Sequence, residues 1–234
     1  MRVSITLLSH EHVLPIFLRD VYPLLRDCFP DLHANDDDDA GDLSNAEALS
    51  NCCGFFEPTA CLWVVARLNG DVVGAATVCV VGQHSAYVAN VCVAQRLRGR
   101  RVASLMLRVA SGAMLQRGVS SLVGSVAAQH PDAERLVALY RKLGATIDTS
   151  RSMSSSAPVT YRMCAAITWD QFHLGMAEFI DDAAELQKCV DTGVFDDIDV
   201  DGRRRRKRFL LAGAVLLVAT VALFVVFKSK SRQR

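Results

Sequence analysis

The chain has 234 residues, enough for one hydrophobic core of ordinary size with additional segments. Hydrophobic residues make up 51% of it and charged residues 22%, which excludes a wholly disordered chain. The net charge of +1 conceals a division: residues 203–234 carry ten Lys and Arg and no acid, which leaves 16 basic and 25 acidic residues in 1–202 and argues against nucleic-acid binding.

The periodicity of apolar residues predicts one α/β domain over residues 1–167, with about seven strands. Strands are expected over Val3–Leu8, Cys61–Leu68, Val72–Val81, Ser85–Ala94, Ser121–Ala127, Thr146–Asp148 and Thr160–Ile167. Helices are expected over Glu11–Cys28, Gly99–Arg117 and Asp132–Lys142. Asn69–Asp71 is a strong hairpin signal. Solvated loops are expected over Asn35–Asp42, which holds the acidic run Asp36–Asp39, and over the Ser-rich Arg151–Pro158.

An amphipathic helix is expected over residues 168–190. Thr168 and Gln171 have capping-box spacing at its start, and apolar residues then recur with the helical period. This helix can pack on the domain, lie on a membrane or bind a partner, and packing on the domain is the simplest interpretation. Residues 191–208, first acidic and then basic, are expected to be a solvated linker.

Residues 209–227 are predicted to form a transmembrane helix. They carry no charge, and a helix of this length spans about 28 Å, close to the hydrocarbon thickness of a bilayer. Basic residues flank the run at 203–208 and in the tail 228–234. We therefore expect a single-pass tail anchor with the body in the cytosol. The mitochondrial outer membrane, the peroxisome and the endoplasmic reticulum are the candidate membranes, and the alternative use of the basic run is a nuclear signal.

The eight Cys contain no C-x-x-C pair, which argues against a zinc ribbon or a thioredoxin-type site. Polar residues interrupt the first apolar run, so no secretory signal is expected and the Cys should be reduced and mostly structural. His10 and His12 have the spacing of two ligands on one strand face, but no third ligand accompanies them, so no metal is predicted.

A predicted helix begins just after Arg98 and Gly99, at the end of a predicted strand. The start of a helix presents free N–H groups and a positive dipole end, which suits a pyrophosphate. Gly99 lets the backbone come close to a ligand, and Arg98, Arg100 and Arg101 add charge for phosphate oxygens. A basic surface helix is the alternative explanation of this pattern alone.

Residues 2–167 resemble the GNAT superfamily of acyl-CoA-dependent N-acetyltransferases. The similar segments are Val93–Ser104, Ala138–Ala145 and the hairpin Asn69–Gly74, in the family's order. The resemblance implies a mixed central sheet flanked by helices, with acetyl-CoA as co-substrate. It also implies two sets of cofactor-binding residues: the strand Val91, Cys92 and Val93 for the pantetheine arm, and the turn Arg98, Gly99, Arg100, Arg101, Val102, Ala103 and Ser104 for the pyrophosphate.

The resemblance also implies catalytic residues. Tyr140 matches the family's general acid near the sulfur of coenzyme A. Tyr87 resembles a tyrosine that acts as a base in some N-terminal-amine acetyltransferases, and His130 is a second candidate base; loss of the proton through water is the alternative. Arg101 stands where the family usually has glycine, so its side chain either crowds the phosphates or binds them.

The expected function is transfer of an acetyl group to a primary amine by direct attack, with the chain held to a membrane through residues 209–227. The acceptor is a lysine, a protein N-terminus or a small polyamine, because the acidic run Asp36–Asp39 suits a cation. Two alternatives remain: a non-catalytic, membrane-tethered scaffold with a degenerate fold, and recruitment of a partner helix by residues 168–190.

Overall fold

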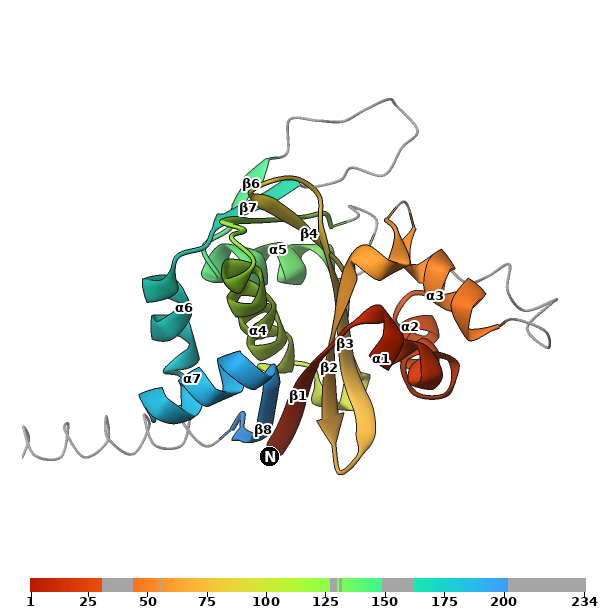
Figure 1. Ribbon diagram of the computed structural model, residues 1–234, viewed down its shortest axis with the longest axis horizontal. Coiled ribbons are helices and arrows are strands. Elements are labelled where there is room, and N and C mark those ends of the chain that lie inside the picture. Colours follow the sequence, from red (N-terminus) through yellow and green to blue (C-terminus); the bar gives the residue numbers. More distant parts are fainter. Residues whose placement is uncertain (31–43, 55, 127–129, 131, 149–161, 202–234) are drawn as a thin grey trace, which may run out of the picture.

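The computed structural model describes residues 1–30, 44–54, 56–126, 130, 132–148 and 162–201. A sheet of eight strands, in the order β6-β7-β5-β4-β3-β2-β1-β8, has helices on both faces (Figure 1). The strands are β1 (Arg2–Leu8), β2 (Cys61–Leu68), β3 (Asp71–Val80), β4 (Ser85–Val93), β5 (Ser121–Gly124), β6 (Thr146–Asp148), β7 (Arg162–Ala166) and β8 (Val194–Asp199). The helices are α1 (His10–Val13), α2 (Tyr22–Cys28), α3 (Asn45–Cys53), α4 (Val102–Gln116), α5 (Ala133–Lys142), α6 (Trp169–Met176) and α7 (Ala183–Thr192).

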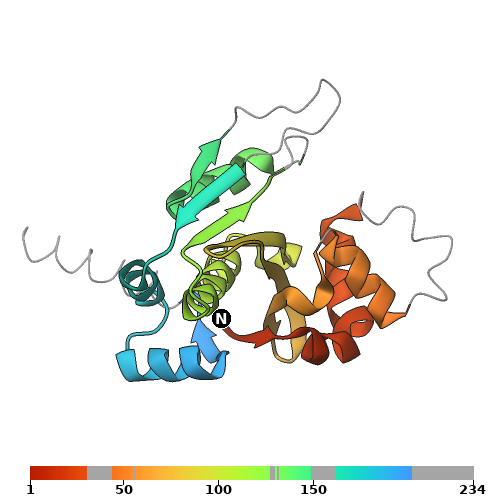
Figure 2. The ribbon, with the colours of Figure 1, turned by 45° about the horizontal axis from the view of Figure 1, so that its top comes forward.

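The sheet is mixed, as predicted. β4 and β5 run parallel, and the other strand pairs of the described sheet are antiparallel. Helices α1 to α3 cover one face, and α4, α6 and α7 lie on the other (Figure 2). Each face has its own core: the first core lies under α1 to α3, and the second lies under α4, α6 and α7. Trp63 and Val65 of β2 belong to the first core, and Val64 and Ala66 belong to the second. Successive side chains of a strand point to opposite faces, so the continuous apolar run of β2 serves both cores.

The predicted helix Glu11–Cys28 is interrupted. It divides into α1, a 3₁₀ turn at Leu14–Ile16, a π-helical turn at Phe17–Val21 and α2. Pro15 and Pro23 lie near the starts of the 3₁₀ turn and of α2. Proline has no N–H to donate inside a helix, so it is tolerated where a helical segment begins.

Helix α3 is an element that the periodicity did not predict. Ser44 caps its first turn by accepting from the N–H of Glu47, and the Glu47 carboxylate accepts from the N–H of Ser44 in return. The capping-box pair is visible in the sequence and was the available signal.

The single helix expected over 168–190 is wrong, because α6 and α7 are separate. The Asp182 carboxylate accepts from the N–H groups of Ala184 and Glu185 and so begins α7. The Thr168 hydroxyl accepts from the N–H of Gln171 at the start of α6, as expected. Phe172 and Met176 of α6 and Leu186 and Val190 of α7 are buried in the core with α4, so packing on the domain is confirmed. Trp169 and Leu174 of α6 remain exposed.

The expectation of a solvated linker over residues 194–199 is also wrong. This acidic stretch forms β8, which pairs antiparallel with β1 and raises the number of strands to eight. Phe195 is 1% exposed and Ile198 is 5% exposed. Asp196, Asp197 and Asp199 are exposed, and Asp197 pairs with Arg2 of β1. Two buried apolar side chains and a strand partner outweigh the charge of the segment.

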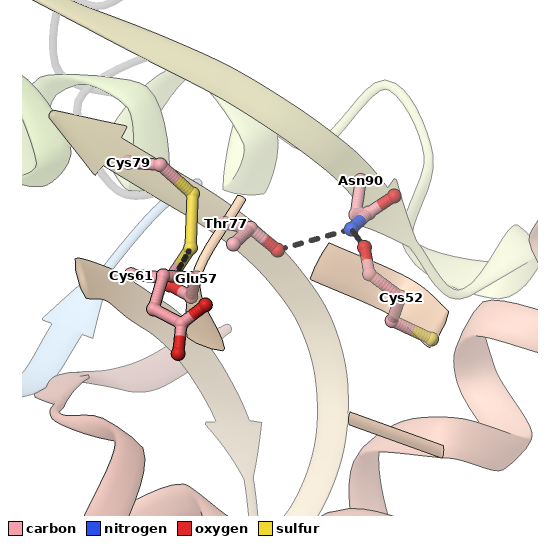
Figure 3. Close-up of a disulfide and its surroundings, with 6 residues drawn as sticks. All are labelled: Cys52, Glu57, Cys61, Thr77, Cys79 and Asn90. Carbon is pink, nitrogen blue, oxygen red and sulfur yellow. Dashed lines mark hydrogen bonds between the residues drawn. A yellow bond between two sulfur atoms is a disulfide. The ribbon is translucent and has the colours of Figure 1, made fainter. Parts of the chain in front are cut away.

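Cys61 and Cys79 form a disulfide between the paired strands β2 and β3 (Figure 3). The expectation that every Cys is reduced is therefore wrong for this pair. Cys28, Cys53, Cys92, Cys164 and Cys189 carry free thiols.

No helix in the described ranges is long and apolar enough to cross a membrane. Several predicted segments lie outside the described ranges. They are the span 209–227, its basic flanks at 203–208 and 228–234, and the loops over residues 35–42 and 151–158.

Candidate active site

The sheet opens between β4 and β5. Their parallel pairing begins at Ser85 with Ser121 and ends at Val88 with Gly124, whereas β4 continues to Val93. Val91–Val93, the residues predicted to bind pantetheine, follow the last β4–β5 pair of the described sheet, so β5 does not pair with their backbone there. A free edge of this kind can hydrogen-bond an extended ligand as a strand would.

A bulge bends β4 where this opening begins. The pairing with β3 skips two residues of β4, Asn90 and Val91, for one of β3, and Asn90 has a left-handed φ of 53°. Its side-chain amide donates to the carbonyl of Cys52 at 2.7 Å and to the hydroxyl of Thr77 at 3.1 Å (Figure 3). These bonds tie the bulge to α3 and β3 and so fix the direction in which β4 leaves β5.

The turn Arg98–Arg101 leads from β4 into α4. Arg101 is the residue before α4 and has a left-handed φ of 68°, and the first turn of α4 contains no acidic residue. The first N–H groups of any helix lack partners within it, so those of Val102, Ala103 and Ser104 are available to an anion. Their grouping at one helix start agrees with the predicted pyrophosphate site.

Gly99 keeps this turn open. Its φ is +79°, and a Cβ placed there would lie 3.4 Å from a terminal nitrogen of Arg135 on α5. Arg135 thus brings a second helix's cation over the turn. No motif in the sequence marked Arg135, because its position depends on how α5 packs beside α4.

Arg98 spans the space between β4 and α5. Its guanidinium donates to the carbonyl of Val93 at 3.3 Å and to the carboxylate of Asp132 at 3.3 Å. A third contact, at 3.8 Å, reaches the sulfur of Cys28 at the end of α2. The side chain is still partly exposed, so its charge is accessible to a ligand.

Arg100 and Arg101 point toward the C-terminal segment. Arg100 pairs with Asp201 at 3.0 Å, and Arg101 pairs with Glu178. The Arg101 guanidinium also lies over the ring of Phe179, 4.4 Å from its centre. The charge of Arg101 is therefore neutralised by the segment after α6, an arrangement that neither expectation for this residue included.

Tyr140 lies at the closed end of the opening. It is buried and lines a pocket together with Val88 and Gly124, the last β4–β5 pair. Burial, with a smaller contribution from Tyr87, raises the pKa of Tyr140 to about 12. The phenol therefore stays protonated at neutral pH and can donate a hydrogen bond or a proton.

Tyr87 reaches the same end of the opening from β4. Its hydroxyl shares a 2.6 Å hydrogen bond with that of Ser125, just beyond β5, and its ring lies 5.3 Å from that of Phe56. Sequence reasoning missed Ser125, which only the divergence of β4 and β5 brings into contact with Tyr87.

His130 begins α5. Its Nδ1 accepts from the N–H of Asp132 at 3.0 Å, and its carbonyl accepts from the N–H of Ala133. With Nδ1 as acceptor, a neutral His130 carries its proton on Nε2. Its contacts within the described residues do not join it to Tyr87 or Tyr140, so its role as a base stays a prediction.

His10 and His12 belong to helix α1, so their predicted place on a strand face is wrong. His12 Nδ1 is hydrogen-bonded to the hydroxyl of Ser9 at 2.7 Å. The described residues hold no group of three or more His, Cys, Asp or Glu side chains suited to a metal ion.

Solved structures of N-acetyltransferases have a similar fold. One from Thermoplasma acidophilum, the PaiA N-acetyltransferase in complex with coenzyme A, is 13% identical with a TM-score of 0.51, covering 71% of this chain and 99% of that one. Ard1 from Thermoplasma volcanium is 17% identical with a TM-score of 0.50, covering 72% and 99%. An aminoglycoside 6'-acetyltransferase type Ii is 15% identical with a TM-score of 0.50, covering 70% and 97%.

A comparison with curated proteins found no match. The model of the acetyltransferase (GNAT) family matches residues 18–145, more than half of the chain and the whole stretch from α2 to α5. The chain belongs to the acetyltransferase (GNAT) family and is an enzyme of the N-acetyltransferase class.

Proposed function

We propose that the enzyme moves the acetyl group of acetyl-CoA to a primary amine at the opening between β4 and β5. The observation that carries this proposal is a single line of groups: the start of α4, the free edge of β4 and the buried phenol of Tyr140. They supply in turn an anion site, an edge for an amide-bearing arm and a proton donor at the closed end.

The residues present fit acetyl-CoA. The free amides of Val102, Ala103 and Ser104 receive the pyrophosphate, with charge added by Arg98 and Arg135. The backbone edge of Val91–Val93 receives the pantetheine arm. Asp201 and Glu178 hold Arg100 and Arg101 to the C-terminal segment. Arg98 pairs with Asp132 but also reaches the Val93 carbonyl beside the free edge of β4, so we assign the role to Arg98 of the turn and Arg135 of α5.

The reaction is direct acyl transfer. The neutral amine nitrogen attacks the thioester carbonyl, a C–N bond forms, the C–S bond breaks, and coenzyme A leaves as a thiolate. Tyr140 stabilises that thiolate by donating its phenolic hydrogen, since the raised pKa keeps the phenol protonated. The proton lost by the amine passes to water beside the Tyr87–Ser125 pair, with Tyr87 or His130 as the alternative base.

The acceptor is a cationic amine: a lysine, a protein N-terminus or a polyamine. Residues 1–202 carry an excess of acidic side chains, which attracts cations, and the run Asp36–Asp39 belongs to that excess. Turnover of matched neutral and cationic amines tests this choice. Equal kcat/KM values for the two would contradict it.

The body is held at a membrane by residues 209–227, as a tail anchor facing the cytosol. This rests on the uncharged run and its basic flanks. Seven residues separate Asp201 from Phe209, so they reach about 25 Å at most and keep the body near the bilayer. Alkaline carbonate extraction of the full chain and of a 1–208 truncation tests the anchor, and release of both would refute it. Imaging of the tagged full chain tells the mitochondrial outer membrane, peroxisome and endoplasmic reticulum apart.

The non-catalytic scaffold is less well supported, because Glu178 and Phe179 hold the Arg101 side chain to the C-terminal segment. Recruitment of a partner helix by residues 168–190 is less well supported too, because Phe172, Met176, Leu186 and Val190 are buried in the core, which leaves Trp169 and Leu174 as the exposed large apolar side chains of α6.

One experiment separates catalysis from a scaffold. The full chain in detergent is assayed with acetyl-CoA and a panel of amines, beside the variant Tyr140→Phe. Loss of a positioned acid should lower kcat by about 10²-fold or more while acetyl-CoA still binds. Binding without turnover of any amine would favour the scaffold.

A further inference from the structure

Two cysteines and an arginine meet at the side of the opening, outside the reaction proposed above. Cys28 is the last residue of α2 and is partly exposed, whereas Cys92 of β4 is buried. Cys28 packs against the core that contains Cys92, close enough for an interaction between the two thiols. The Arg98 guanidinium lies 3.8 Å from the Cys28 sulfur, and the Val93 carbonyl lies at 3.8 Å from it as well.

The surroundings give the two thiols different charges. The interaction with Cys92 and the nearby Arg98 lower the pKa of Cys28 to about 6, against the opposing effect of burial. The same interaction and burial raise the pKa of Cys92 well above the ordinary value. Burial by itself raises the pKa of a thiol, as it does at Cys53, where the pKa is about 11. The low pKa of Cys28 therefore comes from its neighbours. At neutral pH the pair therefore consists of one exposed-side thiolate and one buried thiol.

We propose that Cys28 and Cys92 are a peroxide-reactive dithiol, with Cys28 as the attacking sulfur and Cys92 as the resolving one. The Cys28 thiolate attacks a hydroperoxide; an S–O bond forms, the O–O bond breaks, and hydroxide or alkoxide leaves with a proton from water. The Cys92 sulfur then attacks the sulfenic sulfur; an S–S bond forms, the S–O bond breaks, and hydroxide takes the Cys92 proton to give water. The hydroperoxide is reduced, and the two thiols are oxidised.

Arg98 links this pair to the cofactor, and this link rests on the proposed function. The guanidinium that stabilises the Cys28 thiolate is also the one expected to contact the pyrophosphate. A bound phosphate draws Arg98 away from Cys28 and adds negative charge nearby, which raises the pKa of the thiol. Acetyl-CoA should therefore slow the reaction of Cys28.

The first test is alkylation of the full chain in detergent with iodoacetamide, followed by peptide mass spectrometry. At pH 6, Cys28 should react roughly 20-fold faster than a thiol with a pKa of 9.0, after allowing for the lower nucleophilicity of a more acidic thiolate. Its rate should level off above about pH 7. Cys164 is exposed and serves as the control for access. Slower reaction at Cys28 than at Cys164 at pH 6 would overturn the proposal.

The second test is hydrogen peroxide on the same preparation. A disulfide-linked pair of peptides containing Cys28 and Cys92 is the expected product. In Cys92→Ser, Cys28 should stop at the sulfenic or sulfinic acid, and in Cys28→Ser, residue 92 should stay a thiol. Persistence of both free thiols in the unaltered chain at peroxide doses that oxidise Cys164 would overturn the proposal.

Acetyl-CoA separates the dithiol from the cofactor site. Slower alkylation of Cys28, with no change at Cys164, supports the shared use of Arg98. A disulfide that forms at the same rate with saturating acetyl-CoA would leave the dithiol established and would refute the link through Arg98. If calorimetry showed that the unaltered chain does not bind acetyl-CoA, the proposed function would be refuted, and the results on the two thiols would still hold.

Discussion

The guanidinium of Arg101 is ion-paired with the carboxylate of Glu178, so the residue that begins α4 is held by the segment that follows α6. Arg100 makes a parallel connection to Asp201, beyond β8. Asp201 also lies 3.7 Å from the N-terminal ammonium of Met1, which joins both ends of the described chain to this turn. The turn proposed to bind phosphate is thus supported by residues outside the stretch matched by the family model.

Glu178→Gln should destabilise the fold. Arg101 is 17% exposed and would keep a largely buried charge without its carboxylate, whereas the Phe179 ring would remain. The expected loss is about 1–2 kcal/mol, between the values for exposed and fully buried pairs. Urea unfolding of the full chain in detergent measures it. Glu57→Gln, at an exposed carboxylate, is the control, and equal midpoints for the two variants would contradict the role of the pair.

Arg98→Ala should weaken binding of acetyl-CoA by about 10- to 100-fold, because it removes a charge-assisted contact to phosphate. Isothermal calorimetry gives the dissociation constant. Arg96→Ala removes a neighbouring, exposed arginine, 3.9 Å from Asp71, and should change affinity by less than threefold. Similar losses in both variants would mean that net charge near the turn, and no particular contact, governs binding.

The stability of the enzyme should fall as the pH rises above 10. The pKa of Tyr140 is raised from 10.0 to about 12, so the folded chain keeps a proton that the unfolded chain releases in this range. The stability is fully present below pH 10 and about 2–3 kcal/mol of it is lost by pH 12. Tyr140→Phe should lack that part of the decline in urea unfolding at pH 9, 10 and 11. Parallel declines in both proteins would contradict the burial of the phenol.

Phe195→Ala should cost about 3–5 kcal/mol, because the side chain is almost completely buried between β1 and the second core. Thermal unfolding followed by circular dichroism measures the loss. Val194→Ala, at a partly exposed neighbour on the same strand, should cost less than half as much. If Phe195→Ala unfolded at the unaltered temperature, β8 would not be part of the cooperative fold.

Much of this protein could be predicted from the sequence because the signals were local. Apolar runs rich in Val located β2 and β3, an apolar stripe located α4, and the Asn69–Asp71 turn joined β2 to β3. The segment Arg98–Ser104 located the helix start at which we propose an anion site, since the free amides of a helix start depend only on where the helix begins.

Other features depended on packing. Residues 194–199 are acidic enough to suggest a solvated linker, and only the open edge of β1 makes them a strand. Sequence composition records charge, but it does not record which backbone edge is free to pair.

The contacts of the proposed site residues also depended on packing. Glu178 lies 77 positions from Arg101, Cys28 lies 70 positions from Arg98, and Ser125 lies 38 positions from Tyr87. No periodicity relates residues so far apart, because each distance is set by how helices and strands pack across the sheet. The sequence by itself determined which helix start and which tyrosine are proposed as anion site and proton donor, and the tertiary structure decided that Arg98 stays accessible while Arg101 is neutralised.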